Sequence, residues 1–258
     1  MDFECIIYEK KEHIATIKLN RPQVLNAMNK QLWLDVQEAL KDARTDQGVK
    51  AVIITGEGRA FSTGADLKES KTRTMEAYRD YLAELQEASR KIIRFEKPTI
   101  AAINGYALGS GYELALACDI RIAAEDAQIG SPEAKVTSAV TGGAMRLVQD
   151  LIGPAKAREL LFTAEYIDGK EAERIGLVNK AVPLENLMEE TREMAAKIVK
   201  NSAFSLKMIK RGLLMASGEA SLEALMDYEV EACLACVSTK ERQDSLKVFE
   251  HRKEKDNA

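Results

Sequence analysis

Two glutamates and two glycine-containing turns are the parts of this sequence whose residue types and spacing could do chemistry. The turns span residues 59–67 and 104–114, and each follows a short apolar run. Glycines at such places let the backbone approach a ligand closely and leave N–H groups pointing outward. The second turn leads into a predicted helix at 111–117, whose N-terminal N–H groups favour a developing anion. Glu113 in this turn and Glu133 further along could act as general base and general acid.

Each glutamate also has a purely structural interpretation. The spacing Ser110-x-x-Glu113 fits a capping box, in which two side chains satisfy the first N–H groups of a helix. Ser131-Pro132-Glu133 fits an N-cap, followed by proline at the first helical position and an early acidic residue. Spacing alone leaves both interpretations open.

Nucleotide binding is a rival interpretation of the glycines. The spacing of Gly105, Gly109 and Gly111 does not match G-x-G-x-x-G, and no acidic residue follows at the expected place after a second strand. The phosphate-loop pattern G-x-x-x-x-G-K-[ST] is absent from the sequence as well. We therefore discount both kinds of nucleotide site.

The two turns, followed by a Pro-Glu pair, resemble the enoyl-CoA hydratase/isomerase family, the crotonases. The motifs occur in the family's order: Phe61-Ser-x-Gly-Ala-Asp-Leu67, Asn104-Gly-x-Ala-x-Gly-x-Gly-x-Glu-Leu-Ala-x-x-Cys-Asp119 and Pro132-Glu133. Later segments match in kind: Leu161-Phe-Thr-Ala164, Ala172-x-x-Ile-Gly-Leu-Val178 and Phe249-x-x-x-Arg252-Lys253. The resemblance covers nearly the whole chain, and the combination is specific although each short motif alone is weak.

This resemblance implies an α/β fold, a crotonase-type spiral of ββα units with a C-terminal helical trimerisation region. Residues 1–200 would form the spiral core, and residues 201–258 would form the helical oligomerisation region. The assembly that it implies is a homo-oligomer, either a trimer or a dimer of trimers. Helically spaced apolar residues in the tail independently indicate packing against the same subunit or a neighbouring one.

The resemblance also implies roles for the residues singled out above. The backbone N–H groups of Ala65 and Ser110 would hold the oxygen of an acyl thioester while it carries enolate charge. Ser110 stands where many family members have glycine, so its backbone angles must suit a residue with a Cβ. Glu113 and Glu133 match the paired glutamates that manage water and protons in hydratases of the family.

Binding of coenzyme A is a second set of implied roles. The residues that would border it are Asn26, Gly64, Ala65, Asp66, Leu67 and Lys68. Lys68 would lie near a phosphate, and Arg21 would border the coenzyme too. Arg252 or Lys253 of a neighbouring subunit would add charge, although exposed basic residues of this kind are as often simply solvated. Coenzyme A is then part of the substrate, and neither a metal nor a redox cofactor is expected.

The reaction implied by the resemblance is reversible addition of water across the trans-2 double bond of an enoyl-CoA, which gives a 3-hydroxyacyl-CoA, as in fatty acid β-oxidation. Hydratases of the family typically continue after Pro-Glu into Leu-Gly-x-x-Pro-Gly-x-Gly-Gly-Thr, but residues 134–145 lack the Pro-Gly pair. By resemblance that segment shapes the acyl pocket, so the acyl group stays open. The alternatives are enoyl-CoA isomerisation, hydration of a cyclic dienoyl-CoA, and a non-catalytic CoA-binding subunit.

Alternating strands and helices must position these turns. Period-two alternation and short apolar runs predict strands at residues 13–19, 51–55, 99–103 and 120–123. Apolar spacing predicts helices at residues 29–43, 75–95, 142–151, 155–162, 170–175 and 184–199, and a helical tail at 203–253. This rhythm favours parallel sheets with covering helices.

Composition argues against several other classes of protein. The formal net charge of −4 leaves no basic excess for the phosphates of a nucleic acid. No apolar run reaches the roughly 18 residues that a membrane span needs. The first residues lack the features of a signal or transit peptide. We therefore expect a cytoplasmic protein with neither a nucleic-acid nor a membrane partner.

Cysteine and histidine usage argues against two further kinds of site. The four cysteines are too few and too scattered for a disulfide framework. Cys233-x-x-Cys236 has no second Cys or His pair that could complete a structural zinc site. Because His13 and His251 are the only histidines, a His-based catalytic triad is not expected.

Overall fold

A computed structural model describes residues 2–70, 74–218 and 231 of the chain. The chain divides into two compact units, Met1–Val199 and Lys200–Ala258. The described part of the second unit contains helix α8 (Ala203–Ala216), whose N-cap hydroxyl belongs to Ser202.

Several predictions fall outside the described residues. They concern the part of the tail helix after residue 218, the pair Cys233 and Cys236, and the basic residues Arg252 and Lys253. The role of residues 201–258 in oligomerisation therefore stays a prediction.

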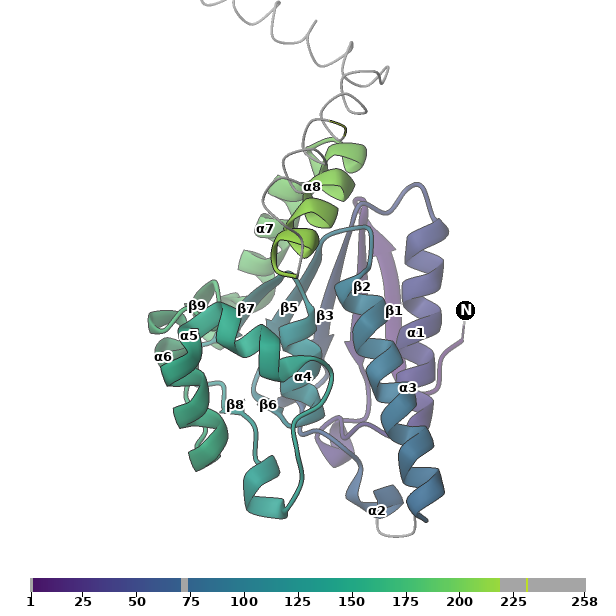
Figure 1. The fold of residues 1–258 in the computed structure, drawn as a ribbon. Coiled ribbons are helices and arrows are strands. Elements are labelled where there is room, and N and C mark those ends of the chain that lie inside the picture. The colour runs from purple at the N-terminus through teal and green to yellow at the C-terminus, as the bar shows by residue number, and fades with distance from the viewer. Residues whose placement is uncertain (1, 71–73, 219–230, 232–258) are drawn as a thin grey trace, which may run out of the picture. The chain divides into compact units, whose positions relative to one another are not determined.

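The strands of the first unit form two sheets (Figure 1). The larger has the order β1-β2-β3-β5-β7-β9, in which β1 and β2 pair antiparallel and all other neighbours pair parallel. Its strands are β1 (Ile6–Lys11), β2 (Ile14–Leu19), β3 (Ala51–Gly56), β5 (Thr99–Ile103), β7 (Ile120–Ala124) and β9 (Lys180–Val182). The smaller sheet is parallel and has the order β4 (Ala60–Ser62), β6 (Tyr106–Leu108), β8 (Ile129–Gly130).

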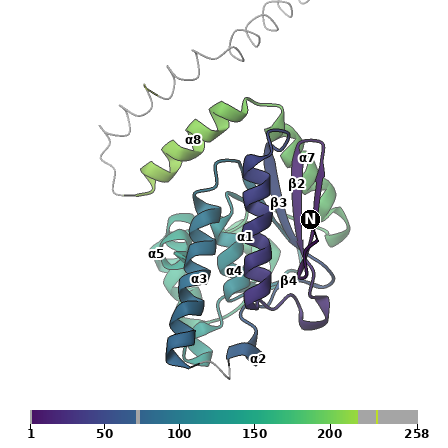
Figure 2. The same cartoon turned by 90° about the vertical axis from the view of Figure 1, so that its right-hand side faces the viewer.

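Helices alternate with these strands along the chain. They are α1 (Lys30–Thr45), α2 (Leu67–Ser70), α3 (Met75–Ile93), α4 (Ser110–Ala117), α5 (Ala144–Thr163), α6 (Gly169–Arg174) and α7 (Leu187–Val199). Short 3-10 helices are η1 (Pro22–Val24), η2 (Glu133–Val136) and η3 (Leu184–Asn186). Helices α1 and α3 lie side by side in both views (Figures 1 and 2). Within residues 2–70 and 74–218, no helix is both long and apolar enough to cross a lipid bilayer.

One pattern occurs three times in the first unit: a strand of the larger sheet, a strand of the smaller sheet, then one or more helices. The first copy is β3, β4, α2 and α3; the second is β5, β6 and α4; the third is β7, β8, η2 and α5. Successive copies pair in parallel within both sheets. The predicted α/β fold of ββα units is therefore confirmed.

The larger sheet has an apolar core on each face. Val52 and Ile54 of β3 belong to the core that α1, α3 and α4 cover, whereas Ile53 belongs to the core that α7 covers. Successive side chains of a strand point to opposite faces, so a strand buried on both faces is a continuous apolar run. This is why β3 and β5 are predicted correctly from short apolar runs.

The first unit differs from the prediction in several places. β1, β9, α2 and the strands of the smaller sheet have no counterpart among the predicted elements. His13, which was predicted to begin a strand, lies in the turn between β1 and β2 with φ of 66°. The helices predicted at 142–151 and 155–162 form one element, α5, which bends where Gly153 adopts φ of 75° before Pro154.

Arg121 in β7 is a buried cation that joins the end of α4 to the chain that follows α6. Its guanidinium donates to the carbonyl oxygens of Cys118 (2.6 Å), Leu177 (2.9 Å) and Ala115 (3.4 Å). The residue is 5% exposed, so water does not compete for these bonds. Because α4 carries Glu113, Arg121 helps to fix the helix that holds a candidate catalytic group.

We expect Arg121→Met to lower the free energy of unfolding by about 3 kcal/mol, because buried carbonyl oxygens lose their donor. Urea-induced unfolding followed by circular dichroism measures the loss. The control is Arg158→Met on the exposed face of α5, for which we expect a change below about 0.5 kcal/mol. Equal losses in the two variants would contradict the bracing role of Arg121.

Candidate active site

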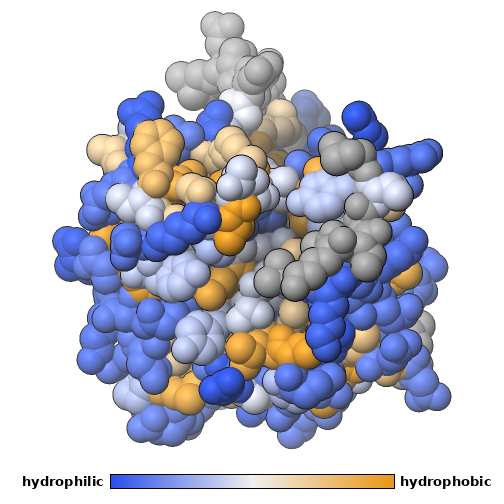
Figure 3. Space-filling model, turned by 90° about the horizontal axis from the view of Figure 1, so that it is seen from below, coloured by the Kyte–Doolittle hydropathy of each residue, from blue (hydrophilic) through white to orange (hydrophobic). Residues whose placement is uncertain are grey.

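Three loops meet at one edge of the smaller sheet. Strands β4, β6 and β8 are parallel, so their carboxyl ends lie at the same edge. β4 is followed by Gly64 and Ala65, β6 by Gly109 and Ser110, and β8 by the segment that ends at Glu133. The edge faces the end of the unit where α2 lies (Figure 1), and that end exposes apolar side chains between hydrophilic ones (Figure 3).

The first two loops approach each other so closely that a side chain would not fit between them. A methyl group placed on Gly64 would lie 2.8 Å from the carbonyl oxygen of Leu108 and 3.2 Å from the backbone nitrogen of Ser110. Gly64 also has φ of 93°, which residues with a Cβ rarely adopt. Glycine at this position therefore lets the two backbones meet.

The N–H of Ala65 points away from the chain segment beside it. Met28 forms a parallel bridge with Ala65: the N–H of Met28 donates to the oxygen of Gly64 (2.7 Å), and the N–H of Asp66 donates to the oxygen of Met28 (3.1 Å). In such a bridge the central residue directs its own N–H to the opposite side. No protein group in the described part of the chain accepts the Ala65 N–H.

The N–H of Ser110 lies at the beginning of α4. Gly109, the N-cap, takes the unusual conformation with φ of 53° and ψ of −125°, so Ser110 itself has an ordinary backbone conformation. The requirement that Ser110 tolerate a Cβ is therefore met. The first N–H groups of a helix have no acceptor within the helix and lie at its positive end. None of the described residues accepts the Ser110 N–H.

Glu113 lies one turn into α4 and is almost fully buried, with 2% of its surface exposed. Both of its carboxyl oxygens are bound by one residue, Thr141. The backbone N–H of Thr141 donates to Oε1 (2.5 Å), and its hydroxyl donates to Oε2 (2.8 Å). The carboxyl group is therefore held in a fixed orientation.

Burial raises the pKa of Glu113 above its ordinary value, because an apolar surrounding disfavours the charged form. The hydrogen bonds from Thr141 oppose this shift, and the nearby charge of Glu133 adds to it. A carboxyl group with a raised pKa, close to a second carboxyl group, is suited to proton exchange.

Glu133 lies against the second loop. Its carboxylate accepts the hydroxyl of Ser131, and a methyl group placed on Gly109 would lie 2.8 Å from its Oε1. Gly109 directly precedes Ser110. The structure therefore brings Glu133, the Ser110 N–H and the first loop together, with Glu113 one helical turn away.

The two capping interpretations are wrong. The N-cap of α4 is Gly109, which has no side chain, while Glu113 binds Thr141 instead of the helix N-terminus. The residue before η2 is Pro132, and the Ser131 hydroxyl binds the Glu133 side chain and no backbone N–H. Both glutamates are therefore available for a role other than capping.

Residues predicted to border coenzyme A form the rim of the first loop. The carboxylate of Asp66 accepts from the Arg21 guanidinium (3.0 Å) and from the N–H of Lys68 (3.0 Å). Burial alone would raise the pKa of Asp66, but these hydrogen bonds outweigh it and lower the pKa. Leu67 begins α2, and the side chain of Lys68 is exposed. Of this group, Lys68 is the residue that could reach a phosphate.

Asn26 is a buried residue that binds the segments around the first loop. Its side chain is fully buried. The side-chain NH₂ group donates to the backbone oxygens of Ala60 (2.7 Å) and Glu57 (3.0 Å), and the side-chain oxygen accepts the backbone N–H of Arg21 (2.8 Å). The backbone carbonyl oxygen of Asn26 accepts a hydrogen bond from the hydroxyl of Ser62 (2.8 Å). All of these groups bind protein, so Asn26 positions the first loop, while its contact with the coenzyme stays a prediction.

Two residues of the site were not found by sequence analysis. Thr141 belongs to the segment that departs from the family pattern, and Ser131 was assigned only to helix capping. No short-range signal links Thr141 to Glu113, because the contact joins segments 28 residues apart. In the described ranges, no group of three His, Cys, Asp or Glu side chains is arranged to hold a metal ion.

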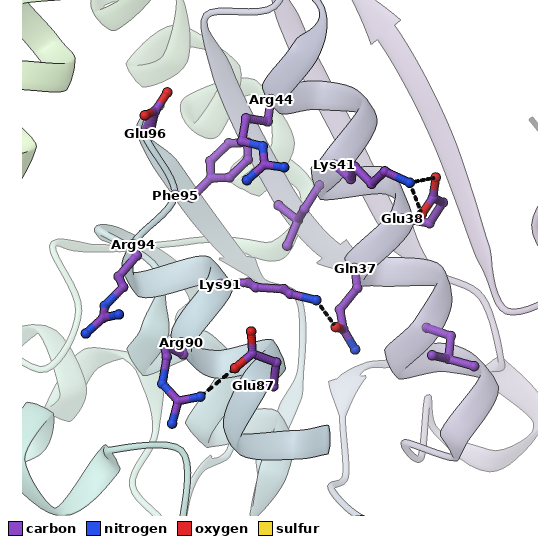
Figure 4. Close-up of a pocket in the computed structure, with 12 residues that line it drawn as sticks. Gln37, Glu38, Lys41, Arg44, Glu87, Arg90, Lys91, Arg94, Phe95 and Glu96 are labelled. Atoms are coloured by element: carbon purple, nitrogen blue, oxygen red, sulfur yellow. Dashed lines mark hydrogen bonds and ion pairs between the residues drawn. The ribbon is translucent and has the colours of Figure 1, made fainter. Parts of the chain in front are cut away.

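A groove of about 500 Å³ lies elsewhere on the first unit, between the C-terminal halves of α1 and α3 (Figure 4). Charged and polar residues on its walls bind each other: Lys91 donates to Gln37 (2.6 Å), and Arg90 pairs with Glu87 (2.5 Å). None of its lining residues belongs to the three loops. We place the candidate active site at the loops, where carboxyl groups lie near two N–H groups that have no acceptor in the described part of the chain.

Known proteins resemble the chain along almost its entire length. A model of the family described as enoyl-CoA hydratase/isomerase matches residues 9–257. A crotonyl-CoA hydratase of Syntrophomonas wolfei is 38% identical over 253 residues, which is 96% of each protein. A short-chain-enoyl-CoA hydratase of Clostridium acetobutylicum is 36% identical over 96% of this chain and 95% of that protein. The crystal structure of an enoyl-CoA hydratase from Bacillus anthracis superposes with a TM-score of 0.94 at 33% identity, covering 96% of this chain and 97% of that one.

Replacement of Gly64 tests the close approach of the two loops. Gly64→Ala and Gly153→Ala both place a side chain where φ is positive (93° and 75°). A methyl group on Gly64 would also lie 2.8 Å from the Leu108 oxygen. A methyl group on Gly153 would have no neighbouring atom of the described residues within 4 Å. We therefore expect Gly64→Ala to lose about 1–3 kcal/mol more of unfolding free energy than Gly153→Ala, measured in urea. Similar losses would mean that backbone conformation alone requires the glycine.

Glu113→Gln is expected to stabilise the protein at neutral pH. The pKa of Glu113 is higher in the folded than in the unfolded chain, so stability falls as pH rises from the ordinary pKa through the raised one. Glutamine has no charge to bury and keeps an oxygen for the Thr141 N–H. Melting temperatures across a pH series should show a difference between variant and wild type that grows from acid to neutral pH. A variant less stable than wild type at neutral pH would contradict the raised pKa.

Proposed function

Because the chain belongs to the enoyl-CoA hydratase/isomerase family, we propose that it is an enoyl-CoA hydratase. It adds water reversibly across the trans-2 double bond of an enoyl-CoA and releases the 3-hydroxyacyl-CoA. One observation carries the proposal: two backbone N–H groups, on Ala65 and Ser110, have no acceptor among the described residues and lie beside two carboxyl groups, of which one is buried. The relatives' names support the same reaction.

The two N–H groups are the electrostatic part of the mechanism. When hydroxide adds at C3, negative charge moves onto the thioester oxygen and an enolate-like state forms. Donors that already point at this oxygen stabilise the charge without reorganising. Loss of one such donor costs about 3–4 kcal/mol in enzymes that use the same device. The close approach of Gly64 to Ser110 brings together the two loops that carry the donors.

Glu113 and Glu133 are the proton-transfer part. One carboxylate takes a proton from water as the oxygen bonds to C3, and the other carboxylic acid gives a proton to C2. The sum is addition of one water molecule, with no net oxidation or reduction. Both groups change protonation in this step, and a proton then passes from the first glutamate to the second, directly or through solvent, before the next turnover. No metal or redox cofactor takes part, and coenzyme A enters as part of the substrate.

The substrate and its setting follow from the relatives. The two hydratases described above are named for crotonyl-CoA and for short-chain enoyl-CoA, which supports a short acyl chain. A place in fatty acid β-oxidation is part of the same proposal. Lys68 at the rim of the first loop supports binding of a coenzyme A phosphate, beside Gly64, Ala65, Asp66 and Leu67. A cytoplasmic homo-oligomer, a trimer or a dimer of trimers, is part of the same proposal.

Double-bond isomerisation is the second candidate. It uses the same enolate and needs one carboxyl group to move a proton between two carbons. The observation that favours it is the unequal state of the glutamates: Thr141 binds both oxygens of Glu113, whereas the partly exposed Glu133 accepts one bond from Ser131. The two reactions differ in whether one glutamate suffices.

Crotonyl-CoA hydration tests the proposal. We expect the wild type to bleach the absorbance of the conjugated thioester rapidly, and Glu113→Gln and Glu133→Gln each to slow this by about 10²–10⁴-fold. Glu185→Gln, an exposed glutamate outside the site, is the matched control and should keep the wild-type rate. If one of the site variants still moved the double bond of a 3-enoyl-CoA at the wild-type rate, isomerisation would replace hydration as the assignment.

A further inference from the structure

Thr141 has no role in the mechanism described above, although it forms two hydrogen bonds to a candidate catalytic group. Its backbone N–H and its hydroxyl each bind one oxygen of Glu113, at 2.5 Å and 2.8 Å. We propose that Thr141 is a positioning residue that keeps the Glu113 carboxyl group in one orientation through both of its protonation states. This inference rests on the proposed function, because it concerns a group that gains and loses a proton in each turnover.

The two donors of Thr141 are chemically different, and the difference matters. A backbone N–H can only donate, so Oε1 must always accept. A hydroxyl can donate or accept. When Glu113 is charged, the Thr141 hydroxyl donates to Oε2; when Oε2 carries the proton, the carboxylic acid donates to the hydroxyl. Rotation of one O–H bond is enough to keep both contacts, and no heavy atom has to move.

The backbone fixes Thr141 in place. The carbonyl oxygen of Thr141 accepts the N–H of Ala144 (2.9 Å) at the start of α5. The next residue, Gly142, has φ of 61°, and a methyl group on it would lie 2.8 Å from Ser89 Oγ and 3.4 Å from Glu113 Cβ. The segment therefore packs directly on both α3 and α4. The hydroxyl of Thr141 has little freedom to leave Glu113.

The neighbouring charge does not favour the charged form of Glu113, as the hydrogen bonds from Thr141 do. The groups that act on Glu113 are the carboxylate of Glu133, which raises its pKa, and Thr141, which lowers it. Tyr112, on the same helix, is buried, and its own pKa is raised, so it stays neutral. From α3, Ser89 brings an uncharged hydroxyl to the neighbouring residue, Gly142. Thr141 is therefore the source of the hydrogen bonds that favour the charged form of Glu113.

Three variants separate the side chain from the backbone. Thr141→Val keeps the shape and the backbone N–H but removes the hydroxyl, whereas Thr141→Ser keeps both donors. Thr191→Val is the matched control: Thr191 is fully buried in α7, and its hydroxyl binds the Leu187 carbonyl (2.7 Å) on the other face of the larger sheet. All three are compared by melting temperature, by the pH profile of kcat/KM for crotonyl-CoA, and by infrared titration.

The infrared titration follows the C=O band of protonated Glu113, which is identified by its loss in Glu113→Gln. We expect the midpoint in Thr141→Val to rise by about one pH unit, because a hydrogen bond to the charged form is lost. The acid limb of kcat/KM should rise with it, and kcat should fall about ten-fold. Thr141→Ser should restore wild-type values, and Thr191→Val should leave midpoint and kcat unchanged.

An unchanged midpoint and pH profile in Thr141→Val would overturn the proposal, even if the melting temperature fell, because a purely structural role predicts only that fall. A midpoint that rises equally in Thr191→Val would overturn it too. If the wild type fails to hydrate crotonyl-CoA but the midpoint rises in Thr141→Val alone, the proposed function fails and the positioning of Glu113 by Thr141 stands.

Discussion

The contact between Gly64 and the Gly109–Ser110 turn is the constraint on which the site depends. Two backbone N–H groups from different ββα copies can serve one oxygen only when their loops nearly touch. Gly111 adds a second contact, since a methyl group on it would lie 2.3 Å from the Ser62 oxygen. The parallel pairing of β4, β6 and β8 brings the three loops to one edge, and the glycines then let the backbones close the remaining gap. The third strand places Glu133 against the same turn.

Burying the carboxyl group of Glu113 in the site lowers the stability of the fold when that group is charged. Glu113 lies in a helix that is buried along its whole length, and burial raises its pKa. Such a group is tolerated because the rest of the unit supplies the stability, through an apolar core on each face of the larger sheet and through buried bonds such as those of Arg121. A carboxyl group whose pKa is raised by burial is suited to proton exchange, so under the proposed function the same feature would serve catalysis.

The spacing of apolar residues in the sequence predicted correctly the helices and strands whose apolar faces are buried in the core. The helix expected at 29–43 is α1, with Asn29 as its N-cap, and the apolar runs became β3 and β5. β1 was missed because its hairpin turn uses Glu12 and His13 at positive φ, where Asn-Gly would have been the signal. The strands of the smaller sheet have two or three residues, too few to show a period. The loops were found through glycines and the family resemblance, whereas the Thr141–Glu113 contact depends on tertiary packing.

The departure of residues 134–145 from the family pattern has a physical consequence. By resemblance this segment shapes the acyl pocket, and in the structure it also supplies the hydrogen bonds that hold Glu113. Under the proposed function, pocket shape and proton transfer would then be set by the same short stretch of chain. A substitution that moved this stretch to admit a longer acyl group would also move the hydroxyl of Thr141 away from the carboxyl group. Since misplacement of a catalytic group by about 1 Å can cost a hundredfold in rate, the proposal implies that substrate range and turnover are coupled through this segment.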